Sequence, residues 1–433
     1  MLRGSVKAAT AVVGFPCFAL AYRERRRVIP HDAIESVDSV LSSPLHCTKT
    51  RIFHALRPLI FLLDPETAHS ASIFSAQLIA PLYMVWQKLK KLTHSSLEKT
   101  ADLVFCPSSL HQPNPPSGGR LGNKVCGIQF SSPCGVAAGF DKNGKLINFF
   151  QSNVIPLGHA EIGSVSYGPW EGNPRPRLFR LVPDQAIINR MGLNNDGARA
   201  VASRLSSRDS GCSDVQIGIN ITKTPDPKIE GNDAVTDIAS SFEFMQFLDS
   251  VSWITLNISC PNTAEGKTFE DIHALSDLLS AICSKKSGKK IFLKLSPLNN
   301  LDDKKYIIDV AKKFHIDALV IANTVPDRNF DLKSDSPIIQ QKGGLSGPPI
   351  FERSIPLIRM GYKSGLPVIG VGGVSSGKDA YRLIRNGASL IQLYTAMVYH
   401  GPFVFEDIHR GLERCLLIDG FRNVSEIIGI DAD

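Results

Sequence analysis

Cys260 is the side chain whose position in the sequence best fits a reactive group. It follows directly on an apolar run, residues 253–259, and precedes Pro261, so it lies in a loop at the end of a predicted strand. A thiol with an ordinary pKa of about 8.5 is partly ionised at neutral to alkaline pH. A buried cysteine is more often inert packing. Because this one follows a strand end that faces a predicted pocket, we expect it to transfer a proton or act as a nucleophile.

Amide and ammonium groups accompany this thiol. Four asparagines stand in or near other predicted strand ends, at Asn189, Asn257, Asn262 and Asn323. Each amide offers both a C=O acceptor and N–H donors, so such a set could bind a planar heterocycle with alternating C=O and N–H groups. Lys142 and Lys294 add positive charge for a carboxylate or for a reduced ring. The pattern predicts a site for a polar, ring-shaped small molecule.

Two glycine clusters extend the predicted site. Gly372, Gly373 and Gly377 follow the seventh apolar run, where backbone N–H groups and a helix N-terminus can approach an anion. In α/β barrels the loops after strands seven and eight commonly hold a phosphate. The segment 343–347 (Gly-Gly-Leu-Ser-Gly) lies between the sixth and seventh runs. It is either a plain turn or a backbone that lies against a flat cofactor.

Eight short apolar runs must position these groups, each followed by polar residues and a helical stretch. The runs are Gly135–Phe140, His159–Val165, Ile217–Ile221, Trp253–Ser259, Ile291–Ser296, Ala318–Asn323, Pro367–Gly373 and Ser389–Thr395. Continuous apolar strands alternating with helices are typical of a parallel α/β sheet. An open doubly wound sheet is the rival, but no GxGxxG opens the first unit. We therefore predict a (β/α)₈ TIM barrel, whose active site lies at the C-terminal strand ends.

Composition limits the alternatives. The 433 residues are 43% hydrophobic and 21% charged, which excludes a disordered chain and a polytopic membrane protein. The net charge of +7 is too diffuse to indicate nucleic-acid binding. Nine cysteines without a CxxC pair disfavour a disulfide scaffold or a zinc ribbon. No HExxH, EF-hand, Walker or GxSxG motif is present, so we expect no metal.

The N-terminus is basic and apolar. Arg3 and Lys7 precede an apolar run over residues 8–22, and the cluster 23–27 (Arg-Glu-Arg-Arg-Arg) follows it. The run is shorter than the roughly 17–25 residues of a membrane span. A secretory signal, a mitochondrial presequence and a marginal membrane anchor all compete here, and a frayed terminus is the simplest alternative. We expect targeting together with anchoring.

Two amphipathic helices are predicted over residues 51–92. Apolar residues recur at helical spacing on both sides of Asp64-Pro65, a good cap and first-turn pair. The two helices either dock on the core of the main domain or meet lipid or a lipophilic ligand. The segment 106–123 is rich in Pro, Ser and Gly and is predicted to be a linker or surface loop.

Several motifs in order resemble those of the dihydroorotate dehydrogenases, FMN-dependent enzymes of pyrimidine synthesis, over nearly everything from Leu63 to Ile430. The motifs are Ala137–Lys142, Glu171–Arg177, Ile188–Gly192, Asn257–Thr263 and Gly370–Gly377. The run Asp64–His69 resembles the helical extension of the membrane-bound class, which passes electrons to a quinone. The resemblance implies oxidation of dihydroorotate to orotate, a ubiquinone-type acceptor, a transmembrane helix and a location at the mitochondrial inner membrane.

The resemblance also implies roles by position. FMN would contact Ala137, Ala138, Gly139, Ser164, Asn220, Asn257, Lys294, Gly344, Gly373, Tyr394 and Thr395. Dihydroorotate would meet Lys142, Asn189, Arg190, Met191, Gly192, Leu193, Asn257, Asn262, Asn323 and Thr324. Cys260 matches the catalytic base, and the quinone site would include Arg180, Tyr394 and His69.

The chain departs from the membrane-bound class at a few positions. That class usually has Ser where Cys260 stands, Gln where Ile60 stands, and Thr where Val398 and Ala322 stand. These changes leave the implied reaction intact. Another flavin barrel acting on a pyrimidine ring would need a basic tRNA-binding face or iron–sulfur cysteine spacing, and neither is present. A binding protein that has lost catalysis would not need Cys260 or the lysines.

The expected organisation has four parts. Residues 1–30 would be a targeting leader and membrane anchor, and residues 45–95 a helical extension that forms the quinone tunnel at the membrane. Residues 96–125 would be a linker or insertion, and residues 126–433 the FMN-binding barrel.

Overall fold

The computed structural model describes residues 44–92, 119–206, 213–259, 269–297 and 301–433. The predicted leader, most of the predicted linker, Cys260 and Asn262 lie outside these residues.

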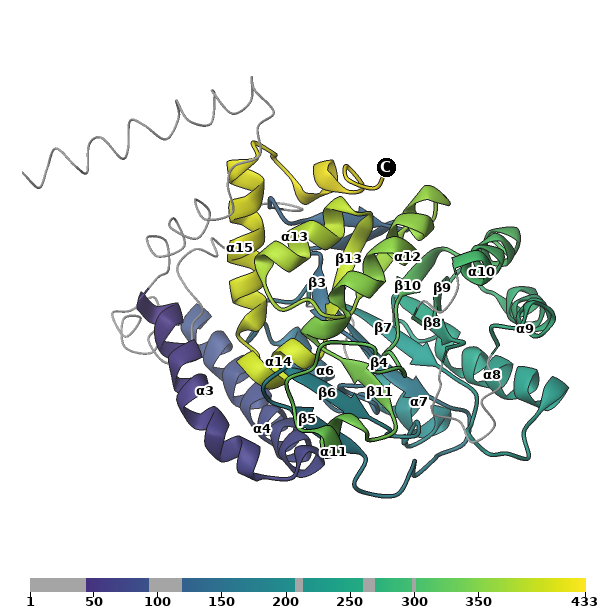
Figure 1. Ribbon diagram of the computed structural model, residues 1–433, viewed down its shortest axis with the longest axis horizontal. Helices are drawn as coiled ribbons and strands as arrows, with labels where there is room; N and C mark the ends of the chain where they lie inside the picture. The colour runs from purple at the N-terminus through teal and green to yellow at the C-terminus, as the bar shows by residue number, and fades with distance from the viewer. Residues whose placement is uncertain (1–43, 93–118, 207–212, 260–268, 298–300) are drawn as a thin grey trace, which may run out of the picture.

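Eight parallel strands close into a barrel, which confirms the predicted fold (Figure 1). The strands are β3 (Cys134–Val136), β4 (His159–Val165), β7 (Gln216–Ile221), β8 (Trp253–Asn257), β9 (Lys290–Lys294), β10 (Ala318–Ile321), β12 (Val368–Val371) and β13 (Ala388–Leu393). Every predicted run contains one of them or overlaps it. The pairing of β13 with β3 closes the ring.

Helices surround the barrel because each strand needs apolar cover on its outer face. They are α6 (Ile147–Gln151), α7 (Ala198–Ser206), α8 (Gly231–Gln246), α9 (Ile272–Lys285), α10 (Leu301–Lys313), α12 (Phe351–Lys363), α13 (Gly377–Arg385), α14 (Thr395–His400) and α15 (Val404–Ile418). The short helices α11 (Ser336–Ile339) and η1 (Pro348–Ile350) lie in connections, and η2 (Val424–Ile427) follows α15. The large core lies between strands and helices.

A hairpin closes the N-terminal end of the barrel. It consists of β1 (Asn123–Val125) and β2 (Ile128–Phe130), paired antiparallel. Val125 and Phe130 pack with Trp253 and Phe292 in an apolar cluster inside the barrel. This end is filled by side chains, so the opposite end is the one that can hold a ligand.

A small antiparallel sheet lies at the C-terminal end of the barrel. Its strands are β5 (Leu178–Leu181), β6 (Ala186–Asn189) and β11 (Gly344–Ser346), in the order β11-β6-β5. Its own apolar cluster includes Leu181, Ile188 and Leu345. The sheet therefore brings Asn189 and Gly344, far apart in sequence, to the same end as the strand ends.

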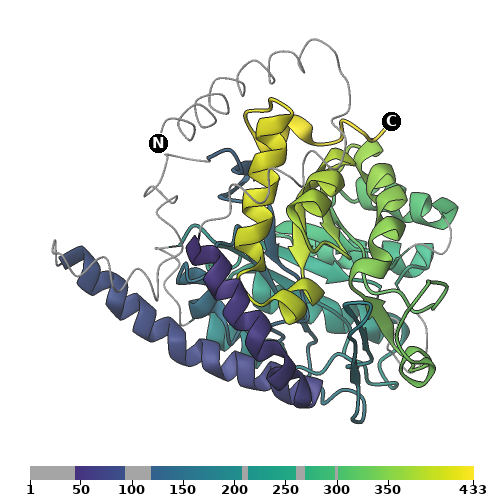
Figure 2. The ribbon, with the colours of Figure 1, turned by 60° about the vertical axis from the view of Figure 1, so that its left-hand side comes forward.

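The two long helices predicted near the N-terminus are present. They are α3 (Pro44–Leu62) and α4 (Pro65–Leu92), joined by a turn from which they diverge along one side of the barrel (Figure 2). The Asp64 carboxylate caps α4 by accepting the N–H groups of Glu66 and Thr67, both at 3.0 Å. The helix α3 packs on α14, and α4 packs on α6 and β5. No helix within the described ranges has the length and apolar character needed to cross a bilayer.

An ion pair fastens the start of α4 to the barrel. The Arg177 guanidinium donates to both oxygens of Glu66, at 2.7 and 3.1 Å, and both side chains are buried. Arg175 donates to the same carboxylate at 3.0 Å. The Arg177 and Arg175 bonds hold the pKa of Glu66 below its usual range, although burial opposes them.

Candidate active site

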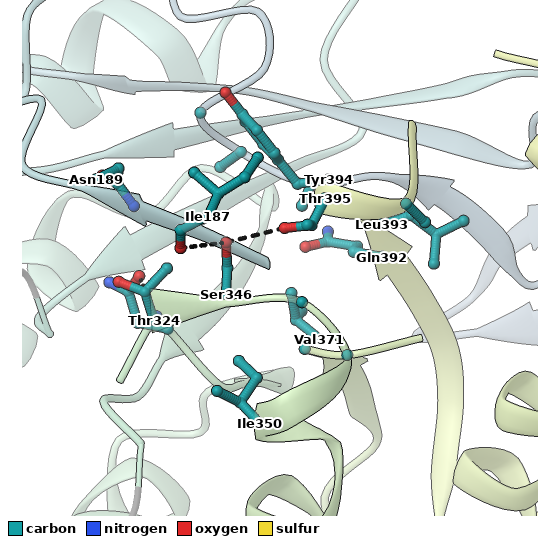
Figure 3. Close-up of a pocket in the computed structure, with 18 of the residues that line it drawn as sticks. Ile187, Asn189, Thr324, Ser346, Ile350, Val371, Gln392, Leu393, Tyr394 and Thr395 are labelled. Carbon is teal, nitrogen blue, oxygen red and sulfur yellow. Dashed lines mark hydrogen bonds between the residues drawn. The ribbon is translucent and has the colours of Figure 1, made fainter. Parts of the chain in front are cut away.

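Most of the predicted site residues line one pocket at the C-terminal end of the barrel (Figure 3). They are Ala137, Ala138, Gly139, Lys142, Ser164, Asn189, Met191, Gly192, Leu193, Asn257, Lys294, Asn323, Thr324, Gly373, Tyr394 and Thr395. They come from the ends of seven barrel strands or the loops that follow them, and from the small sheet and the loop after β6. Convergence of polar groups from many strands is the usual construction of a TIM-barrel active site.

Five predicted residues do not line this pocket. The guanidinium of Arg190 points away, donating to the Gln341 side chain at 3.0 Å and to the Pro176 carbonyl at 2.9 Å. Arg180 donates to the carbonyls of Phe61 and Leu63, both at 3.1 Å, at the end of α3. Gly344, Asn220 and His69 are also absent from the pocket lining.

A buried turn aims Lys142 into the pocket. The preceding Asp141 is almost fully buried, and its carboxylate accepts backbone N–H groups from Asn143, Lys145 and Leu146 at 2.6–3.2 Å. Burial raises the pKa of Asp141, while these bonds oppose the rise. The turn satisfies its own backbone donors, so Lys142 can extend from a rigid base.

Hydrogen bonds orient the amides of the pocket. The Asn257 side chain donates to the Ser164 hydroxyl at 2.9 Å and accepts from the Ser259 hydroxyl at 3.0 Å. Asn323 donates to the same Ser259 hydroxyl at 3.1 Å. This network joins β4, β8 and the end of β10, so amide direction is set by the barrel. Lys294 ends β9 with an exposed fraction of 5%, which brings a positive charge to a nearly dry position.

A second network supports the opposite wall. The Thr395 hydroxyl donates to the Ser346 hydroxyl at 2.8 Å, and Ser346 donates to the Ile187 carbonyl at 3.3 Å (Figure 3). It joins α14, β11 and β6, so the small sheet is tied to the barrel beside the pocket. No group of three or more potential metal-ligating side chains occurs among the described residues.

A family model described as dihydroorotate dehydrogenase matches residues 120–416, more than half of the chain. The chain belongs to the dihydroorotate dehydrogenase family.

Curated members of the family align over nearly their full length. The dihydroorotate dehydrogenase (quinone) of Natronomonas pharaonis is 35% identical over 384 residues, covering 88% of this chain and 99% of the relative. The enzyme of the same name from Rhodopseudomonas palustris (strain BisA53) is 36% identical over 396 residues, covering 88% and 97%. The dihydroorotate dehydrogenase of Eimeria tenella, solved with ferulenol, superposes with a TM-score of 0.70 at 28% identity, covering 86% of this chain and 98% of that one.

The expected location at the mitochondrial inner membrane is wrong by this comparison. The curated dihydroorotate dehydrogenases named above come from an archaeon and a bacterium, which have no mitochondria. The expectation rested on the basic, apolar residues 1–30, which lie outside the described part of the chain, and a basic apolar leader is not specific to one organelle. The predicted transmembrane helix is likewise unsupported in the described ranges.

Sequence reasoning missed part of the pocket of this dihydroorotate dehydrogenase family member. The missed lining residues include Leu178, Ile187, Pro348, Ile350, Gln392, Tyr399 and His400. Gln392 had a usable signal, because a polar side chain in the middle of an otherwise apolar buried strand needs a partner. The aliphatic and aromatic residues carried no such signal, since they are typical of any core.

An aromatic row connects the pocket to the helical extension. His69 of α4 packs edge-on against Phe140 at 5.0 Å, and Phe140 packs edge-on against Tyr394 at 5.6 Å, measured between ring centroids. Burial, and secondarily the nearby Lys142 charge, lowers the pKa of His69 to about 4. Burial raises the pKa of Tyr394 to about 12. The row is therefore uncharged at neutral pH.

Proposed function

We propose that this chain oxidises dihydroorotate to orotate in pyrimidine biosynthesis, with FMN as the hydride acceptor and a quinone as the final electron acceptor. One observation carries the proposal: two lysines and three asparagines converge on one pocket, and the aromatic row of that pocket leads to an apolar helical hairpin. The polar part suits an anionic pyrimidine ring and a flavin. The apolar part suits a lipophilic acceptor.

The pocket residues fit FMN. Gly139 has a φ of 104°, a backbone conformation that favours glycine, and it lines the pocket wall. Lys294 supplies a buried positive charge, and the Gln392 side-chain oxygen on the wall has no hydrogen-bond partner among the described residues. The proposed FMN contacts are Ala137, Ala138, Gly139, Ser164, Asn257, Lys294, Gly373, Tyr394 and Thr395, with Asn220 and Gly344 behind them. When bound, FMN would accept a hydride and release two electrons to the quinone.

The chain supplies the remaining chemistry. The Cys260 thiolate would take a proton from the ring carbon next to the carboxylate-bearing carbon, which loses the hydride. Lys142 would pair with the substrate carboxylate. The other proposed substrate contacts are Asn189, Met191, Gly192, Leu193, Asn257, Asn262, Asn323 and Thr324. Rigid amides on several strands hold the reacting atoms in line, which is the main contribution a binding site can make to such a step. Arg190 is not a proposed substrate contact, because its guanidinium donates to the Gln341 side chain outside the pocket.

The quinone would enter between the helical hairpin and the barrel. His69 and Tyr394 lie at the two ends of the aromatic row, and the Arg180 guanidinium stacks 4.4 Å from the Phe61 ring centroid. Large apolar side chains on α3 and α4 are exposed, with exposed fractions of 82% for Leu62 and 71% for Leu82. An apolar helix face of this kind suits the boundary between head groups and acyl chains. We propose that the hairpin lies on a membrane surface.

The decisive test of the reaction is the visible spectrum of the purified full-length protein without oxygen. Dihydroorotate should bleach a bound flavin, and a short-chain ubiquinone analogue should restore its colour. Cys260→Ala should keep the flavin and slow its reduction by dihydroorotate by about a hundredfold or more. The proposal fails if dihydroorotate leaves the flavin oxidised, and its quinone part fails if fumarate or NAD restores the colour better than the quinone.

Membrane association is tested separately with phospholipid vesicles. The wild-type protein should float with the vesicles, and a Leu62→Ser, Leu82→Ser double variant should bind them less. Phe247→Ser is the matched control, because Phe247 is 69% exposed at the end of α8, away from the hairpin. If the wild type and the Leu62→Ser, Leu82→Ser variant bind the vesicles equally, the α3–α4 helices are not the membrane contact.

A further inference from the structure

Glu161 carries a buried acidic side chain inside the barrel, below the pocket. It lies on β4 with an exposed fraction of 1%, and three donors from three other strands point at it. Asn220 Nδ2 donates to Oε1 at 2.8 Å, while Thr255 Oγ1 and Gln392 Nε2 donate to Oε2 at 3.1 and 2.9 Å. All four side chains are buried. Glu161 is thus the shared acceptor of a polar layer.

The two amides in this layer have unused oxygens. Asn220 Oδ1 and Gln392 Oε1 are buried, and neither has a hydrogen-bond partner in the described part of the chain. A buried carbonyl oxygen without a donor costs free energy, and such oxygens are uncommon in folded proteins. Gln392 also lines the pocket, beside Leu393 and Thr395 (Figure 3). Its oxygen is therefore placed to accept an N–H group from a bound ligand.

Glu161 explains why the oxygens face away from it. An amide can turn by 180° at almost no change in shape, which exchanges its donor and acceptor ends. If either amide turned, its oxygen would face a carboxyl oxygen, and both groups would be acceptors. Thr255 alone cannot satisfy the Glu161 carboxylate, because it is only one of the three donors. Its hydroxyl oxygen also accepts the Trp253 indole N–H at 3.2 Å.

We propose that Glu161 is a positioning residue for the flavin. It keeps the N–H₂ groups of Asn220 and Gln392 directed toward its carboxylate, so that the oxygen of Gln392, which lines the pocket, remains an acceptor for an N–H group of the bound heterocycle. Glu161 itself touches no ligand and acts through Gln392. The inference rests on the proposed function, because it takes FMN as the occupant of the pocket.

The test measures flavin release from the full-length holoenzyme. The dissociation constant of FMN is obtained from the fluorescence that appears on dilution, for the wild type and for Glu161→Met, Gln392→Met and the double variant. Each single variant should weaken FMN binding on the order of tenfold, since one buried hydrogen bond to the ligand is lost or disordered. In the Glu161→Met background, Gln392→Met should add less than about threefold, because that amide has already lost its fixed orientation.

Thr255→Val is the matched control. It removes the third hydrogen bond to Glu161 at nearly constant shape and leaves both amides held, so the FMN dissociation constant should stay within about twofold of the wild type. If Glu161→Met does not fold, Glu161→Gln replaces it. The N–H₂ group of this glutamine would face one of the donors that now bind Glu161, and two donors cannot bind each other. One amide therefore has to turn, and FMN binding should still weaken.

Two results would overturn the inference. One is a Glu161 variant with a lower unfolding temperature and an unchanged FMN dissociation constant, which would mean a structural role alone. The other is a tenfold effect of Gln392→Met in both backgrounds, which would make the residues independent. If the wild-type protein carries no FMN, the proposed function fails instead, so the two failures are distinguishable.

Discussion

His159 is a buried imidazole that should make the protein lose stability in mild acid. It begins β4 with an exposed fraction of 0%, and neither ring nitrogen has a partner among the described residues. Phe130 and Trp253 pack on it with centroid distances of 5.6 and 6.0 Å. Burial lowers the pKa of His159 from 6.5 to about 3. The folded protein therefore keeps this ring neutral where the unfolded chain protonates it.

The sign and size of the effect follow from proton linkage. Between the folded pKa of about 3 and the unfolded value of 6.5, the unfolded chain binds more protons, so the free energy of unfolding falls as the pH is lowered through this window. From pH 7 to pH 5 the proton-binding factor of the unfolded state rises about 25-fold, which corresponds to about 2 kcal/mol. Above pH 7 the ring is largely neutral in both the folded and the unfolded state, so proton binding at His159 no longer lowers the free energy of unfolding.

The perturbation is His159→Leu, and the assay is denaturant unfolding of the full-length protein at pH 5, 6 and 7. A change in packing shifts the free energy of unfolding equally at every pH, whereas loss of the titrating group changes its pH dependence. The wild type should therefore lose about 2 kcal/mol more than the variant between pH 7 and pH 5. The depressed pKa of His69, about 4, is common to both proteins and cancels.

His273→Leu serves as the control, because His273 is exposed at the start of α9 and loses little water on folding. It should lose as much stability as the wild type between these pH values. If His159→Leu also follows the wild-type pH dependence, the folded protein accepts a proton at His159. Burial would then not keep the His159 ring neutral in the folded protein.

Three further substitutions test individual contacts. Glu66→Gln should cost about 3 kcal/mol by leaving the buried Arg177 without its charge partner, and should speed hydrogen exchange at the start of α4. Gly135→Ala should lower the thermal unfolding midpoint, because an ideal Cβ there would lie 2.3 Å from the His159 carbonyl oxygen, an overpacking worth about 1–3 kcal/mol. Ser376→Ala should cost about 1 kcal/mol in denaturant unfolding, since it removes the hydroxyl of the capping box at α13.

The barrel could be predicted from the sequence because its strands are buried on both faces. Such strands are continuous apolar runs, and the spaces between them are long enough for a helix. The run 159–165 matches β4 residue for residue, whereas the run 135–140 extends past β3, which ends at Val136. The extra residues are also apolar, but they form the loop that turns at Gly139. Apolar character alone cannot distinguish a strand from the loop that leaves it.

Side-chain direction was the part that could not be predicted. Arg190 belongs to a motif next to Asn189, yet its guanidinium is bound by Gln341 and Lys342, about 150 residues later in sequence. Arg180 is similarly held by the end of α3. Long charged side chains bind whichever carbonyls the fold places near them, and sequence spacing does not reveal those partners. The proposed roles of Cys260 and Asn262 stay predictions, because both lie outside the described residues.

The strand β4 illustrates how one barrel serves both a core and a polar site. His159 and Glu161 are two residues apart, so both point into the barrel. His159 packs among aromatic rings near the β1–β2 hairpin, where a polar ring is tolerated only as a neutral group. Glu161 lies one layer nearer the pocket, where three donors require an acceptor. The interior thus becomes more polar from the closed end to the open end. That gradient lets the same ring of strands exclude water at its base and offer fixed hydrogen-bonding groups at its mouth.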